Sequence, residues 1–83
     1  MCFQFSKHVI VEMKTRAIPL SVVQEVLDNP EQKVPEIGDV ICYQSRIEIN
    51  DKPYLIRVMV NETLNPPKVV TVYRTSKIGK YWK

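Results

Sequence analysis

The sequence predicts an α+β domain in which two N-terminal helices pack on one face of a three- to four-stranded antiparallel sheet. Apolar residues recur at helical spacing up to Asn29-Pro30, and from residue 33 onward they alternate with a period of two. The connections between the alternating segments are short, which favours antiparallel neighbours. The chain has 83 residues, 45% of them hydrophobic and 25% charged, so we expect a single domain over residues 1–83.

The first expected helix covers residues 7–17. Ser6 precedes it as a good N-cap, because its hydroxyl can accept a hydrogen bond from a free backbone N–H of the first turn. Apolar residues at helical spacing give this helix a buried side: Val9, Ile10, Met13 and Ala17. Polar residues at i, i+4 spacing share its opposite face: His8, Glu12 and Arg16.

A second, shorter helix is expected over residues 21–28. Ser21 and Gln24 have the spacing of a capping box. Asn29-Pro30 should end the helix, because proline restricts the residue before it and cannot continue the hydrogen-bond ladder. Its buried side consists of branched apolar residues: Val22, Val23, Val26 and Leu27.

Three strands are expected in the second half: "VPEIGDVICYQSRIEIN", with a break at Gly38, "PYLIRVMVNE" and "KVVTVYRTS". "NDK" and "ETLNPP" are the turns between them. In the middle strand Tyr54, Ile56, Val58 and Val60 point one way, while Leu55, Arg57 and Met59 point the other. The core is therefore expected to contain Ile10, Met13, Val23, Val26, Leu27, Ile56, Val58, Val70 and Val72.

The composition and the cysteine count limit the classes of function that the chain can have. A net charge of +3 and a pI of about 9.0 permit an RNA or an acidic protein partner without requiring one. Cys2 and Cys42 form no CxxC motif, and with one histidine they are too few for a zinc site. No signal peptide and no membrane-length apolar run is present, so we expect a cytoplasmic protein with reduced thiols, no metal, no cofactor and no membrane contact.

Several residues suit metal-free cleavage of RNA, which needs a proton-transfer group and cations around the phosphate. His8 is the only histidine, and the pKa of an unperturbed imidazole suits proton transfer. Arg16, Arg57 and Arg74 are candidate phosphate clamps, since a guanidinium donates two parallel hydrogen bonds. Tyr73 could contact the base or the 2′-OH.

Each of these residues also has a structural interpretation. The row of His8, Glu12 and Arg16 can be a solvated helix face. Arg57 can pair across strands with a carboxylate such as Glu48, and Tyr73 can simply be a good strand former. In the C-terminal "YRTSKIGKYW", Lys77 and Lys80 suit either phosphate binding or solubility. Tyr81 and Trp82 should pack on the domain or a partner rather than stack on RNA bases.

The stretches "FSKHVIVEMKTRAIPLSVVQEVLDNPEQ", "GDVICY" and "VVTVYRTSKIGKYW" resemble a bacterial family catalogued as domain of unknown function 4258. That family is similar in its helix-then-sheet plan to ribonuclease toxins of the RelE type. The resemblance implies a RelE/barnase-like fold and a metal-independent ribonuclease toxin of a toxin–antitoxin pair. Matching positions are His8, Arg16, Thr71 and Tyr73. The chain departs from the family at Glu12, commonly an Arg, and at Ala17, commonly a Gly.

Three functions follow as hypotheses. The first is a ribonuclease toxin that cuts RNA, free or ribosome-associated, with His8, Arg16 and Tyr73 as catalytic residues and an antitoxin protein as partner. The second is a non-catalytic binding or assembly module, a decayed toxin that forms a homodimer or binds an antitoxin. The third is a sequence-independent nucleic-acid binder that uses the basic C-terminal strand.

Overall fold

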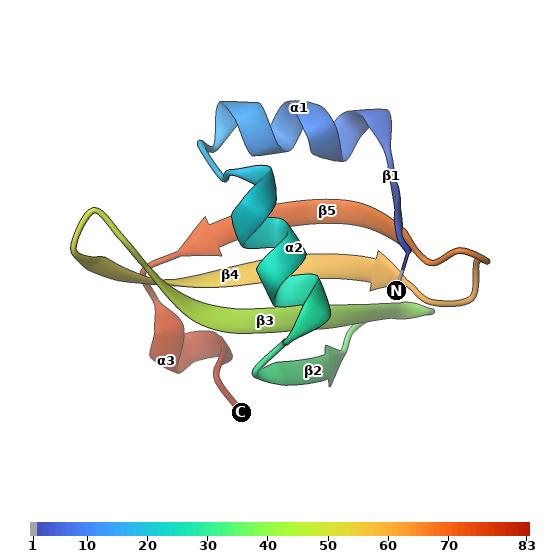
Figure 1. The fold of residues 1–83 in the computed structure, drawn as a ribbon. Coiled ribbons are helices and arrows are strands. Elements are labelled where there is room, and N and C mark those ends of the chain that lie inside the picture. Colours follow the sequence, from blue (N-terminus) through green and yellow to red (C-terminus); the bar gives the residue numbers. More distant parts are fainter. Residues whose placement is uncertain (1) are drawn as a thin grey trace.

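The computed structural model describes residues 2–83 and forms a five-stranded sheet with three helices (Figure 1). The elements in chain order are β1 (Gln4–Phe5), α1 (Lys7–Thr15), α2 (Leu20–Asp28), β2 (Gln32–Pro35), β3 (Val40–Ile49), β4 (Lys52–Asn61), β5 (Lys68–Thr75) and α3 (Ile78–Tyr81). Strand order in the sheet is β1-β5-β4-β3-β2. Within residues 2–83, none of the helices has the length and apolar character needed to span a membrane.

The α+β class and the antiparallel meander of β3, β4 and β5 are confirmed. The strand count needs correction, because the sheet is mixed and has five strands. β1 pairs in parallel with β5, with Gln4 opposite Lys68, and it is too short to produce a periodic signal. The first expected strand is two strands, β2 and β3, which form a hairpin. Gly38 lies in their connection with a φ of 70°, where glycine avoids the cost of a side chain.

Both N-terminal helices form, with different ends from those expected. Ser6 caps α1 as expected, because its Oγ accepts from the Val9 N–H at 3.0 Å. The helix ends at Thr15 rather than at residue 17. Pro19 precedes α2 as its N-cap, and within the described structure no side chain caps this helix, so the capping box at Ser21 was wrong.

A Schellman motif explains why α1 ends early. Ala17 adopts a φ of 52°. Its N–H donates to the Lys14 carbonyl at 3.2 Å, and the Ile18 N–H donates to the Met13 carbonyl at 2.9 Å. Ile18 and Met13 are both buried, which is the apolar contact that usually accompanies this motif. The turn redirects the chain so that α2 can cross the sheet.

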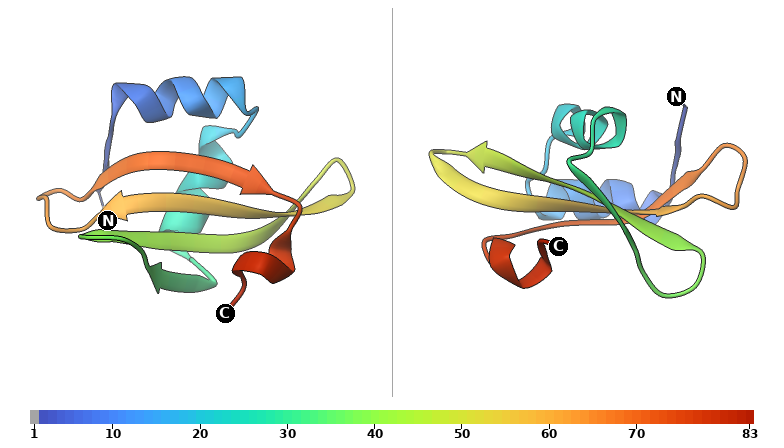
Figure 2. Two further views of the ribbon diagram at one scale, coloured as in Figure 1. Left: turned by 180° about the vertical axis from the view of Figure 1, so that it is seen from behind. Right: turned by 90° about the horizontal axis from the view of Figure 1, so that it is seen from below.

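α1 and α2 cover one face of the sheet, and α3 lies on the opposite face (Figure 2). α1 packs along β5, while α2 crosses β3 and β4. The core between these layers consists of Val9, Met13, Ile18, Val23, Val26, Leu27, Tyr43, Ile56, Val58, Val60, Val69 and Val72.

Two expected core residues are placed differently. Ile10 is 45% exposed, because it faces the gap between α1 and α2 rather than the sheet. Val70 is half-buried, and Val69 takes its place in the core. The cause is a register shift between Met59 and Val60, which reverses the alternation of β5 at that point.

The C-terminal residues pack on the domain. The Tyr81 ring lies over the Arg57 guanidinium at 4.4 Å, and the Trp82 ring lies over that of Arg46 at 4.3 Å. The Gln32 side chain donates to the Lys83 carbonyl at 3.0 Å and accepts from the Lys83 N–H at 3.2 Å. These contacts hold α3 against the second face of the sheet.

Candidate functional site

The first polar cluster of interest lies on α1, where Glu12 is held between His8 and Arg16. Glu12 Oε2 lies 3.5 Å from His8 Nε2 and 3.4 Å from Arg16 Nη2, so one carboxylate oxygen contacts both side chains. The other oxygen accepts from the Val72 N–H at 3.3 Å. Ser6 fixes the start of the helix, and the i, i+4 spacing then places all three side chains on one side.

Glu12 is only 8% exposed, so the face that carries it is not fully solvated as the sequence suggested. Its carboxylate satisfies a backbone donor of β5 on the side of that strand away from β4. By contrast, the side chains of His8 and Arg16 are 73% and 46% exposed. The cluster therefore presents an imidazole and a guanidinium to solvent above a carboxylate that fixes their positions.

The second polar cluster surrounds Arg57 on the opposite face of the sheet. Arg57 is 5% exposed. It donates from Nε to Gln44 Oε1 at 2.9 Å, from Nη2 to Glu36 Oε1 at 2.7 Å and from Nη1 to Tyr73 Oη. The Tyr81 ring covers the guanidinium. All three nitrogens of Arg57 are thus engaged within the domain.

The charge states in this cluster follow from burial and hydrogen bonding. Burial opposes the charged form of Arg57, but the hydrogen bonds that it donates to Tyr73 and Glu36, with the charges nearby, outweigh burial and raise the pKa of the guanidinium. Burial raises the pKa of Tyr73 despite the hydrogen bond from Arg57, so Tyr73 is a neutral phenol at pH 7. Burial also raises the pKa of Cys42 to about 11, which leaves a thiol rather than a nucleophilic thiolate.

The remaining predicted cations lie outside both clusters. The Arg74 guanidinium stacks on the Tyr54 ring at 4.9 Å on the helix side of the sheet. Lys77 is the N-cap residue of α3, and its N–H donates to Thr75 Oγ1 at 3.1 Å. Lys80 Nζ lies 5.3 Å from the centre of the Tyr81 ring. Lys77 and Lys80 are exposed.

The structure thus brings together His8 with Arg16, and separately Arg57 with Tyr73. The first pair flanks a carboxylate at the edge of β5, the second lies on the face of the sheet that carries α3, and no described hydrogen bond or ion pair joins them. Among residues 2–83, no three His, Cys, Asp or Glu side chains gather as metal ligands would.

Sequence reasoning missed two polar partners of Arg57. Gln44 is fully buried, and its amide also donates to Gln32 Oε1 at 2.8 Å and to the Tyr81 carbonyl at 3.2 Å. The sequence does contain a signal for Gln44, because it is a lone amide in the apolar run "VICYQ". In the structure it lies opposite Arg57 across β3 and β4. Glu36 comes from the loop before β3, and no local pattern indicates its role.

Comparison with known proteins gives one family. A family model described as "Domain of unknown function (DUF4258)" matches residues 5–74, which include α1, α2 and the whole sheet except the first residue of β1 and the last residue of β5. No curated protein and no solved structure matches the chain.

Proposed function

The chain belongs to the DUF4258 family over residues 5–74, and we propose that it is a metal-independent ribonuclease of the RelE toxin type. It acts in the cytoplasm and is held inactive by an antitoxin. The observation that carries the proposal is the cluster of His8, Glu12 and Arg16. An exposed imidazole is oriented by a nearly buried carboxylate, and a guanidinium lies beside it. An oriented imidazole beside a guanidinium is a combination that general acid–base catalysis at a phosphate can use.

Each residue of the cluster has one role in the proposed reaction. His8 takes the proton of the ribose 2′-OH, the O2′–P bond forms, and the P–O5′ bond breaks. The products are a 2′,3′-cyclic phosphate and a 5′-hydroxyl, whose proton comes from solvent. Arg16 donates to the phosphoryl oxygens as charge develops on them. Glu12 positions both side chains and is a positioning residue rather than a catalytic one.

The carboxylate of Glu12 is compatible with an anionic substrate. A free carboxylate at this position would repel a phosphate, which is the concern raised by finding Glu where the family commonly has Arg. Here the charge of Glu12 is offset by Arg16 and by the Val72 N–H, and its side chain is 10% exposed. The RNA therefore meets the imidazole of His8 and the guanidinium of Arg16 rather than the carboxylate.

A second candidate function rests on the engagement of Arg57 and Tyr73. Both are bound to groups of the domain, and Tyr81 covers the guanidinium. Two of the expected RNA-binding residues thus have structural partners, which favours a non-catalytic binding module over a complete RNA cleft. Under this alternative, the cluster on α1 only fastens the helix to β5.

Induced expression in a bacterium separates the two functions. Wild type, His8→Ala and Arg16→Ala are scored for growth arrest and RNA decay, and the purified proteins are assayed for RNA cleavage in a chelator. Loss of a general acid or base should lower cleavage by about 10²–10⁴ while RNA affinity stays nearly unchanged. Lys7→Ala is the matched control, because Lys7 is an exposed cation next to His8 that lies outside the cluster.

The outcomes are distinct. Equal cleavage by wild type and His8→Ala would contradict the assignment of His8. A folded wild-type protein that neither cleaves RNA nor arrests growth would favour the binding module. RNA affinity that falls steeply with salt, without cleavage, would instead indicate a nucleic-acid binder, and Arg74→Ala should then flatten the salt slope by about one unit.

A further inference from the structure

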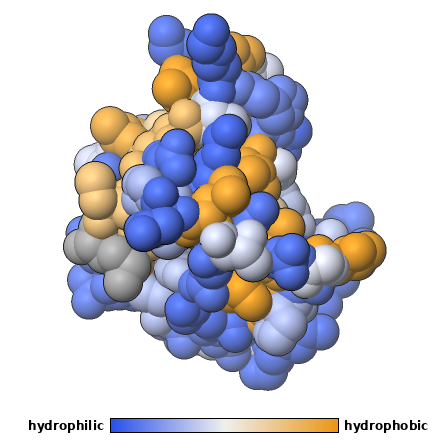
Figure 3. Space-filling view, turned by 90° about the vertical axis from the view of Figure 1, so that its right-hand side faces the viewer, coloured by the Kyte–Doolittle hydropathy of each residue, from blue (hydrophilic) through white to orange (hydrophobic). Residues whose placement is uncertain are grey.

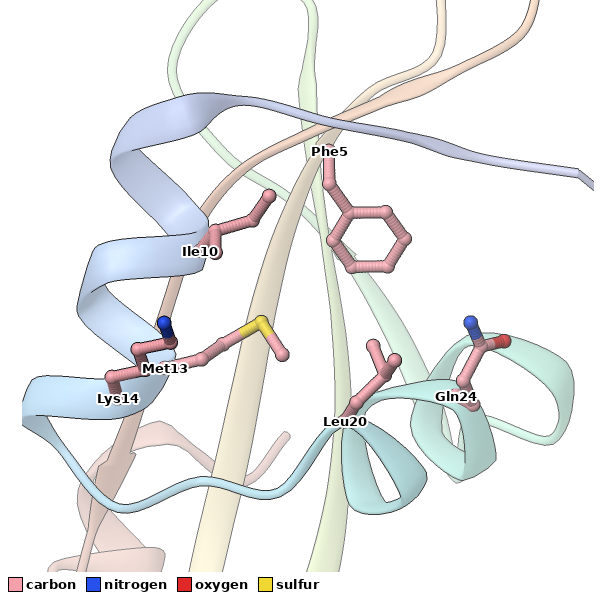
Figure 4. Close-up of a pocket in the computed structure, with 6 residues that line it drawn as sticks. All are labelled: Phe5, Ile10, Met13, Lys14, Leu20 and Gln24. Carbon is pink, nitrogen blue, oxygen red and sulfur yellow. The ribbon is translucent and has the colours of Figure 1, made fainter.

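An apolar groove lies between α1, α2 and β1, on the side of the molecule that carries the helices (Figure 4). It has a volume of about 440 Å³ and is lined by Phe5, Ile10, Met13, Lys14, Leu20 and Gln24. In Figure 4 the ring of Phe5 and the side chains of Ile10, Met13 and Leu20 surround one open space. The groove is distinct from the His8 cluster, whose carboxylate points to β5.

The residues around the groove leave large apolar groups in solvent. Ile10 is 45% exposed, Leu20 is 53% exposed, and the neighbouring Val11 is 61% exposed. Seen from the end where β1 lies, apolar atoms gather on the helix side of the molecule, on the left in Figure 3. Isolated exposed apolar residues are ordinary, but residues that gather at a concave site mark a surface for a partner.

The α1 side of the groove is basic. Lys14 is the charged residue among those that line it. Lys7, Ile10 and Lys14 have i, i+3, i+7 spacing on α1, so a second lysine shares the same helical face. Glu12, the acidic residue of this helix, is turned toward β5 and paired with Arg16. A partner with carboxylates beside its apolar surface would complement this charge.

The elements around the groove also indicate which secondary structure a partner would dock there. A groove lined by side chains of two helices accepts an amphipathic helix, whereas an added strand needs free backbone groups at a sheet edge. The edge of β5 is occupied here by β1, and Glu12 accepts from the Val72 N–H further along the strand. A second copy docked by the same face would bring its Lys7 and Lys14 close to those of the first, so like charges would meet.

We propose that this groove binds an amphipathic helix of a partner protein, with apolar residues in the groove and acidic residues beside Lys7 and Lys14. The antitoxin of the proposed function would be one such protein, but the inference does not depend on catalysis. The groove and the His8 cluster consist of different residues, so either proposal can be refuted while the other stands.

The test uses two synthetic helical peptides as probes, and the full chain as receptor. Both peptides carry the same leucine stripe at i, i+3 and i+7, and they differ only in flanking residues, which are glutamate in one and lysine in the other. Binding is followed by fluorescence anisotropy. We expect saturable binding of the glutamate peptide, and affinity weaker by about tenfold or more for the lysine peptide.

Three variants locate the binding. Leu20→Asp should weaken binding of the glutamate peptide by about tenfold or more, and Lys14→Glu should reverse the preference between the two peptides. Both residues are exposed, so the fold should tolerate these changes. Ile37→Asp is the matched control, because Ile37 is an apolar residue that is 93% exposed in the β2–β3 loop, and binding should not change.

Several results would overturn the proposal. These are no saturable binding of either peptide, equal affinity for both, or binding unaffected by Leu20→Asp. Sedimentation that shows a homodimer dissociated by Leu20→Asp would assign the groove to a second copy instead. His8→Ala should bind the glutamate peptide as wild type does, which separates this result from the test of RNA cleavage.

Discussion

Replacing Ala17 with glycine should stabilise the protein, although alanine is the better helix former. Ala17 follows the last turn of α1 and has a φ of 52°, in the left-handed region that disfavours any residue with a Cβ. The hydrogen bonds of the Schellman motif require this conformation, since they join the N–H groups of Ala17 and Ile18 to the last carbonyls of the helix. The strain therefore cannot relax without loss of the motif.

The size of the effect follows from two opposing terms. An L-residue in the left-handed region costs about 1–2 kcal/mol, which glycine would remove. Glycine is more flexible in the unfolded chain, which offsets about 0.5–1 kcal/mol. Ala17 is exposed, so loss of its methyl group removes little buried area. The net gain in the free energy of unfolding is about 0.5–1 kcal/mol, or about 2–8 °C in Tm for a domain of this size.

Urea denaturation of Ala17→Gly and wild type, followed by circular dichroism, measures the gain. Gly38→Ala is the control with the opposite sign. Gly38 has a φ of 70°, and a Cβ added there meets no described atom within 4 Å, so the cost is that of the backbone alone. If Ala17→Gly were no more stable than wild type while Gly38→Ala lost stability as expected, the account of the turn would be refuted.

Three further outcomes test other parts of the structure. Arg57→Met should lower the free energy of unfolding by about 2–4 kcal/mol, because it leaves several polar partners unsatisfied; wild-type stability in urea would argue against this role. Hydrogen bonds from Tyr43 and Lys33 lower the pKa of Glu62 from its ordinary value of 4.5. This carboxylate therefore stabilises the fold above pH 4.5, and the stability lost in Glu62→Gln should vanish as the pH falls below the lowered pKa; a loss that is equal at all pH values would exclude this linkage. Mass spectrometry after alkylation at neutral pH should find only the exposed Cys2 modified in the native protein and Cys42 modified only in urea, since Cys42 is buried with a pKa of about 11.

Local signals were enough to place most elements of the fold. The hydroxyl of Ser6, the stop at Asn29-Pro30 and the break at Gly38 each act over a few residues, so the sequence shows them directly. The predictions of the fold were wrong where contacts between residues far apart in the sequence determine the structure. β1 has two residues and exists because β5 lies beside it. Val69 rather than Val70 enters the core because of a register shift that is set by pairing with β4.

The candidate site, like the fold, was predictable only where local spacing determines it. Spacing alone placed His8, Glu12 and Arg16 on one side of a helix. It did not show that this side would turn Glu12 toward β5, because that depends on how α1 packs. Arg57 was predicted to clamp a phosphate, with a cross-strand pair to a carboxylate such as Glu48 as the alternative, but Glu48 lies opposite Pro53 and is too far along the strand. The carboxylate that Arg57 meets comes from a loop.

The parallel pairing of β1 with β5 has a consequence for how the protein is made. Gln4 and Phe5 leave the ribosome before their partners Lys68 and Val69, which follow more than sixty residues later. α1 packs mainly along β5, so its apolar side has no strand to cover it until β5 has been synthesised. The apolar side chains Val9 and Met13 therefore stay without their strand partner until β5 emerges, and this layer of the fold can form only after that point.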